Sequence, residues 1–127
     1  MSRHVAYVGD VMATAVELAG ASPPTPRDGL WSVSLVPTLT GRPQAQRRHA
    51  FLYWESYERG TGQAVRFGRW KAVRDGIGRG PVELYDLERD PGERTNVATA
   101  HPDVLAQAER HMEQAHVPAP AWTAHAR

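Results

Sequence analysis

The spacing of apolar residues changes along the chain, and each change marks a different element. Between residues 10 and 19 the spacing is that of an amphipathic helix. Its apolar positions are Val11, Met12, Ala15, Val16 and Ala19. We expect Asp10 to cap the first turn by accepting backbone N–H hydrogen bonds, and Gly20 to end the helix in the left-handed conformation. Because a helix this short and apolar needs a partner surface, we expect its apolar residues to lie in a core.

Residues 21–48 are expected to form a connector without a long regular element. They include five Pro and two Gly, and both residue types interrupt helices and strands. The pattern leaves room for one short helical turn, over residues 36–40. It also places a domain boundary near residue 45.

After this boundary the pattern alternates with the period of β-strands. The strands are expected over residues 50–57, 63–67, 70–74 and 82–87. Gln63, Val65 and Phe67 are expected to share one face. Gly68 and Arg69 have the form of a two-residue hairpin loop, in which Gly68 supplies the positive φ. The pattern predicts a small antiparallel sheet of three to four strands.

A second amphipathic helix is predicted after His101. Pro102 and Asp103 suit its first turn, and His116 ends it. Its apolar stripe consists of Val104, Leu105, Ala108, Met112 and Ala115. A sheet this small is marginal alone, so the helix is expected to cover one of its faces. The predicted fold class is therefore α+β.

The charged stretch between the last strand and this helix has the residues of a turn. Asp90, Pro91 and Gly92 are common turn residues, and Asn96 is expected to hold the chain through an Asx-type hydrogen bond. Four charges of alternating sign are expected to compensate one another at the surface. They are Glu88, Arg89, Glu93 and Arg94. We therefore interpret this stretch as a joint and not as a metal or acid-base site.

Composition indicates a globular chain with little net charge. The 127 residues are 41% hydrophobic and 23% charged, with a formal net charge of +1. This balance shows no electrostatic footprint for nucleic acid or for an anionic membrane surface. The short basic run from Arg47 to His49 is expected to be a solvated loop. With no Cys, the chain has no disulfide, thiolate nucleophile or Cys-ligated metal site.

Targeting signals are equally sparse in the sequence as given. No stretch approaches the roughly 20 apolar residues of a membrane span. Residues 1–10 lack the pattern of a signal peptide. As written, the chain is expected to be cytoplasmic.

Individual motifs do not indicate a catalytic or metal site. His111 and His116 are five positions apart, which places them about 140° apart on a helix. A shared zinc ion is therefore not expected. The glycine-rich segment DGIGRGP joins two strands and lacks the spacing of a phosphate-binding loop. The tryptophans are expected to be core residues or, alternatively, to stack on sugars. They are Trp31, Trp54, Trp70 and Trp122.

Five stretches taken together carry more information than any single motif. In order, they are DVMATAVELAG, DGLWSVSLVPTLTGRP, FLYWESYERGTGQAVRFGRWKAVR, ELYDLERDPGERTNVA, and HPDV followed by the last helix. This series, which spans nearly the whole chain, resembles the C-terminal end of an arylsulfatase of the formylglycine-dependent, alkaline-phosphatase-like superfamily. The resemblance implies that residues 1–45 are the last helix and linker of a large α/β catalytic domain. It implies that residues 46–127 are the smaller C-terminal subdomain, which closes one side of the substrate cleft.

The resemblance also implies which parts of a sulfatase the chain lacks. The family hydrolyses sulfate esters with a formylglycine made from Cys or Ser in a C/S-x-P-x-R motif, beside a calcium ion. This chain has no Cys, and the segment SPPTP from Ser22 has Pro26 where Arg is required. We therefore expect no cofactor in this chain and no sulfatase activity from it alone. Intact relatives are often periplasmic or secreted.

Three residues are candidates for the rim of the substrate cleft. They are Glu55, Gln63 and Arg66. Related sequences often have His after the WE pair and sometimes Arg before AVR, where this chain has Ser56 and Gln63. A purely structural role, as a strand salt bridge or edge hydrogen bonds, is the alternative.

Two classes of function are compatible with these patterns. The first is a C-terminal sulfatase portion, from a truncated gene, a misplaced start codon or a split protein, which a C/S-x-P-x-R motif encoded upstream would favour. Its partner would be the missing catalytic domain, or another copy bound through an exposed apolar face. The second is a free-standing module that binds a sugar or a partner protein.

Overall fold

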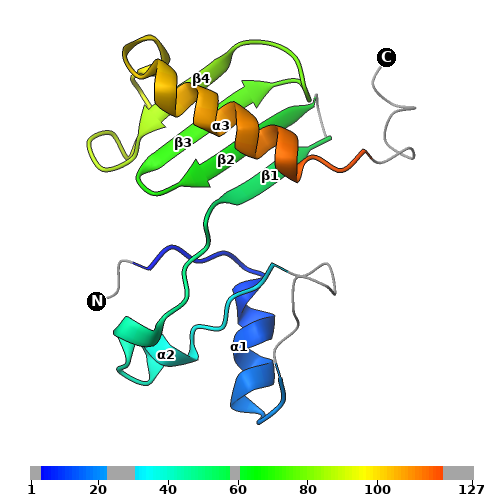
Figure 1. Ribbon diagram of the computed structural model, residues 1–127, viewed down its shortest axis with the longest axis vertical. Coiled ribbons are helices and arrows are strands. Elements are labelled where there is room, and N and C mark those ends of the chain that lie inside the picture. The colour runs from blue at the N-terminus through cyan, green and yellow to red at the C-terminus, as the bar shows by residue number, and fades with distance from the viewer. Residues whose placement is uncertain (1–3, 23–30, 58–60, 119–127) are drawn as a thin grey trace. The chain divides into compact units, whose positions relative to one another are not determined.

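The computed structural model describes residues 4–22, 31–57 and 61–118. The chain divides into two compact units, with the boundary in the sequence between His49 and Ala50. Figure 1 shows the elements of each unit. The first three prolines of the connector, Gly29, most of the SPPTP segment and Trp122 lie outside the described residues. Among the described residues, none of the helices has the length and apolar character that a bilayer crossing requires.

The first unit contains α1 (Asp10–Leu18), the short α2 (Val36–Leu39) and a 3-10 turn, η2 (Pro43–Ala45). As predicted, Gly20, two residues after the end of α1, adopts the left-handed conformation with a φ of +78°. The N–H groups of Gly20 and Ala21 donate to the carbonyls of Glu17 and Val16, which satisfies two of the free carbonyls at the helix end. The predicted helical turn over residues 36–40 is confirmed by α2.

The predicted core face of α1 is wrong. The buried residues of α1 are Asp10, Ala13 and Thr14. By contrast, Val11 is 62% exposed, and Met12 and Ala15 are exposed as well. The helix buries its polar side because Asp10 makes hydrogen bonds inside the unit, as described below.

The second unit is built on a four-stranded antiparallel sheet with the strand order β1-β2-β3-β4. The strands are β1 (Leu52–Ser56), β2 (Gly62–Phe67), β3 (Trp70–Asp75) and β4 (Val82–Asp86). The hairpin loop between β2 and β3 is confirmed, with Phe67 paired to Trp70 and Gly68 at a φ of +52°. In the turn before β4, a Cβ on Gly80 would lie 2.8 Å from the carbonyl oxygen of Asp75, so this position requires glycine.

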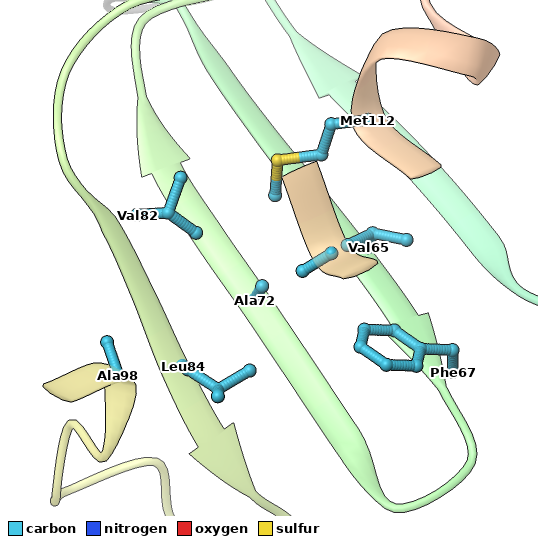
Figure 2. Packing of buried hydrophobic residues seen from close by; sticks show 8 residues of the cluster. Val65, Phe67, Ala72, Val82, Leu84, Ala98 and Met112 are labelled. Carbon is cyan, nitrogen blue, oxygen red and sulfur yellow. The ribbon is translucent and has the colours of Figure 1, made fainter. Parts of the chain in front are cut away.

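Helix α3 (Pro102–Ala115) lies across one face of the sheet, as predicted and as Figure 1 shows. The core between the helix and the sheet includes Val65, Leu84, Ala108 and Met112, all fully buried. Figure 2 shows the side chain of Met112 directed toward the strands. The α+β fold class is confirmed.

The joint between β4 and α3 is held by side chains that accept backbone hydrogen bonds. Oδ2 of Asp90 accepts from the N–H groups of Arg94 and Thr95. Oδ1 of Asn96 accepts from the N–H groups of Leu84 and Ala98, which confirms the Asx-type bond and covers part of the outer edge of β4. The 3-10 turn η3 (Ala98–Ala100) then leads into α3.

The charges of this joint do not compensate one another as predicted. Within the part of the chain that the structure describes, Glu93 pairs with Lys71 of β3 at 2.6 Å, and Glu88 lies 3.8 Å from Arg69 of the hairpin. Arg89 is 3.8 Å from Asp86. The alternating spacing placed these groups near one another in sequence, but the folded sheet offers closer partners.

Candidate functional site

The register of the sheet divides the three predicted rim residues between two faces. Glu55 is the direct partner of Gln63, and Tyr53 is the partner of the core residue Val65, so these side chains lie on the face that α3 covers. Arg66 follows Val65 and therefore lies on the opposite face. The structure brings Glu55 and Gln63 together and separates Arg66 from both.

A hydrogen-bonded network surrounds Gln63, which is 3% exposed. Its amide nitrogen donates to the hydroxyl of Tyr53 at 2.5 Å. Its amide oxygen accepts from Nε of Arg74 and from the N–H of Gly78, each at 3.0 Å. Gln63 thereby joins β1, β3 and the glycine-rich turn at one end of the sheet.

Glu55 continues this network to the end of α3. The hydroxyls of Tyr53 and Tyr57 donate to its two carboxylate oxygens. Nδ1 of His116, directly after α3, lies 2.6 Å from Oε1 of Glu55. The carboxylate therefore ties the last turn of α3 to β1.

The network favours the ionised form of Glu55. Burial alone would raise its pKa, but the hydrogen bonds from Tyr53, Tyr57 and His116 outweigh burial and lower the pKa below its ordinary value of 4.5. Burial, together with the hydrogen bond to Glu55, raises the pKa of Tyr53 well above its ordinary value. The carboxylate of Glu55 thus has partners on β1 and directly after α3. These contacts fit the structural role that was the alternative for Glu55 and Gln63.

The histidines of α3 have separate partners. His111 stacks on Phe51, with ring centroids 4.3 Å apart, whereas His116 contacts Glu55. Burial and the neighbouring Arg110 lower the pKa of His111, which favours its neutral form. Within the described ranges, no three His, Cys, Asp or Glu side chains are grouped so that they could hold a metal ion.

The opposite face of the sheet contains an open hollow of about 390 Å³. Its lining residues are Trp54, Ala64, Arg66, Lys71, Leu87 and Glu93. Both oxygens of Glu93 accept from Nζ of Lys71, at 2.7 and 2.6 Å. Nε of Arg66, in contrast, is buried without a hydrogen-bond partner among residues 4–22, 31–57 and 61–118.

The first unit contains a buried contact between Asp10 and His49 that the sequence pattern did not predict. Asp10 is fully buried, and its carboxylate accepts from the N–H groups of Tyr7 at 3.1 Å and Val33 at 2.8 Å. Nε2 of His49 lies 2.9 Å from the same carboxylate.

This contact overturns two predictions. The predicted cap is wrong, since α1 has no side-chain cap among the described residues. The predicted solvated loop is wrong for His49, whose side chain is 7% exposed. Arg47 and Arg48 are exposed, as predicted.

Substitution Glu55→Gln tests the network through pH. Since folding lowers the pKa of Glu55, its ionised form stabilises the fold above about pH 4.5, and this stability is lost as the pH falls through the folded-state pKa. We expect Glu55→Gln to reduce the free energy of unfolding by about 1–3 kcal/mol at pH 7. Between pH 5 and pH 3 the variant should lose less stability than the wild type. Chemical denaturation at each pH measures both effects.

The control for this test is Glu113→Gln, an exposed position on α3. It should leave the unfolding free energy and its pH dependence nearly unchanged. Parallel pH curves for the wild type and Glu55→Gln would contradict the role of this carboxylate.

Comparison with known proteins reveals a consistent set of relatives. No family model matches the chain. It is 40% identical over 94 residues to a Δ4,5-hexuronate-2-O-sulfatase of Bacteroides thetaiotaomicron, a match that covers 70% of this chain and 18% of that protein. It is 37% identical over 91 residues to the choline-sulfatase of Rhizobium meliloti, covering 70% of this chain and 17% of the relative. The chain thus spans about a fifth of the length of these relatives.

Solved structures agree with the sequence matches in fold. A structure described as a complex with its substrate D-glucosamine-2-N,6-O-disulfate aligns with a TM-score of 0.64 at 21% identity, over 83% of this chain and 22% of the other. The phosphonate monoester hydrolase of Agrobacterium radiobacter aligns with a TM-score of 0.62 at 25% identity, over 91% of this chain and 26% of the other. In sequence and in fold, the chain therefore belongs with the sulfatase family, as the counterpart of the C-terminal portion of its members.

Proposed function

We propose that the chain serves as the C-terminal portion of a sulfuric ester hydrolase and that residues 46–127 form one wall of its substrate cleft. The observation that carries this proposal is the 40% identity over 94 residues to one sulfatase, combined with coverage of only 18% of that protein. The relatives are named for different sulfate esters, among them those of a hexuronate and of choline. The shared element is the sulfate ester, and this is the substrate class that we propose.

In this proposal the chemistry belongs to the part of a sulfatase that the chain does not match. There, a formylglycine formed from Cys or Ser would supply the nucleophile, and a bound calcium ion would stabilise the charge that develops on attack at sulfur. The chain has no Cys, and its one Ser-x-Pro segment has Pro26 in place of the required Arg. The described residues also contain no cluster suited to a metal ion. We therefore propose that the chain alone does not hydrolyse sulfate esters.

The contacts of the three rim candidates support a different proposed role for Arg66 than for Glu55 and Gln63. The polar groups of Glu55 and Gln63 are occupied by partners within the second unit. We propose that they hold the end of β1 and β2 in place. Arg66 has no described hydrogen bond or ion pair, and it is therefore the candidate for direct contact with a ligand.

The exposed apolar face of α1 supports a contact with the catalytic portion. Val11, Ala15 and Leu18 follow one another at helical spacing, and all are exposed. Val8 and Met12 extend this surface, which we call the α1 strip. An exposed apolar patch of this kind is typical of a protein interface. We propose that the catalytic portion of a sulfatase covers the strip, and that copies of the chain associate through it when that portion is absent.

An activity assay with the purified chain tests the proposal that the chain alone does not hydrolyse sulfate esters. With calcium and an aryl sulfate, we expect no more sulfate release than in a control reaction without protein. The sequence contains no formylglycine motif, and the described residues contain no cluster suited to a metal ion. A relative with an intact C/S-x-P-x-R motif serves as the positive control. Calcium-dependent release that scales with the amount of chain would refute the proposal.

Substitution Val11→Asp tests the α1 strip. We expect the wild type to self-associate at high concentration and Val11→Asp to shift it toward the monomer, because a charge in the strip opposes burial of the apolar surface. Light scattering after size exclusion measures the mass. Val117→Asp is the matched control, because Val117 is 75% exposed and lies outside the strip. A wild type that stays monomeric, or equal effects of both substitutions, would count against the strip as an interface.

A further inference from the structure

We propose that the hollow on the open face of the sheet binds an anionic sugar residue, with its sulfate or carboxylate on Arg66 and an apolar face of the sugar on Trp54. The choice of a sugar rests on the proposed function. The choice of an anion rests on the residues of the hollow alone.

No carboxylate within the described part of the chain forms an ion pair with Arg66. Its direct partner in β3 is Lys71, a second cation, and like charges at directly opposed positions repel each other. Lys71 is neutralised by Glu93, which contacts its ammonium group through both carboxylate oxygens. The formal charges of Arg66, Lys71 and Glu93 therefore leave a net charge of +1 in the hollow.

The position of this cation favours an anionic ligand. Nε of Arg66 is buried and lacks a hydrogen-bond partner among the described residues, which is costly for a polar group. A guanidinium presents donors in a fixed plane that matches the oxygens of a carboxylate or a sulfate. An anion beside the guanidinium in the hollow would supply the missing charge.

The hollow also offers a surface for the ring of a sugar. Trp54 is 42% exposed, and its direct partner in β2 is the small residue Ala64, whose methyl group covers little of the indole. Leu87 adds apolar surface to the lining, while the carboxylate of Glu93 can accept from a sugar hydroxyl. An aromatic wall with a few polar groups is the usual composition of a small-molecule site, and about 390 Å³ is within the range of such sites.

Binding to the chain itself tests this inference without any need for catalysis. The probe is D-glucosamine-2-N,6-O-disulfate, titrated into the ¹⁵N-labelled chain and followed by NMR. We expect saturable shifts at residues of β1, β2 and β3 that line the hollow. Arg66→Gln should weaken binding about tenfold or more, because a charged hydrogen bond is lost. Trp54→Leu should also weaken binding while the charge is kept.

Two controls distinguish binding at the hollow from nonspecific electrostatic attraction of the anionic sugar to the chain. Arg110→Gln removes an exposed cation from α3, on the other side of the sheet, and should leave the affinity unchanged. Inorganic sulfate should compete more weakly than the sugar, because it cannot use Trp54. Dispersed NMR spectra establish that each variant is folded.

Three results would overturn the inference. They are the absence of saturable binding, an equal loss of affinity in Arg66→Gln and Arg110→Gln, and inorganic sulfate binding as tightly as the sugar. A chain that binds the sugar and also hydrolyses aryl sulfates would refute the proposal that the chain alone is inactive, and it would leave this inference unaffected.

Discussion

The packing of α3 against one face of the sheet is the constraint on which the second unit depends. A four-stranded sheet of short strands is marginal by itself, and the contact of Met112 and Ala108 with Val65 and Leu84 supplies its core. One helix covers only one face. The polar groups on the covered face must therefore find partners under the helix or at its end, whereas on the other face Lys71 pairs with Glu93 and Arg66 has no described partner.

This difference between the faces explains why neighbouring residues of β2 have different environments. Gln63 is enclosed by Tyr53, Arg74 and Gly78, so its polar atoms are fully engaged. Arg66 lies three positions further along the same strand, on the uncovered face, and has no described partner. A single strand thus contributes one residue that positions the sheet and another that is available to a ligand.

Sequence periodicity predicted most of the second unit, because strands and amphipathic helices repeat at fixed intervals. The strand alternation also places Gln63 and Arg66 on opposite faces, so the sequence alone was sufficient to show that they do not form one patch. The contact between Asp10 and His49 was not predictable in this way, because its partners are 39 residues apart and no local pattern links them. An Asp before an apolar run has the same appearance whether it caps a helix or is buried.

We propose that the chain, as the C-terminal portion of a sulfatase, functions against the catalytic portion. Complementation tests it most directly, with the Bacteroides thetaiotaomicron hexuronate-2-O-sulfatase shortened by the segment that this chain matches. The relative's own segment, added separately, is the positive control. We predict that this chain forms an equimolar complex with the shortened enzyme and restores part of its sulfate release. If the relative's own segment restores activity while this chain neither binds nor restores it, the account is contradicted.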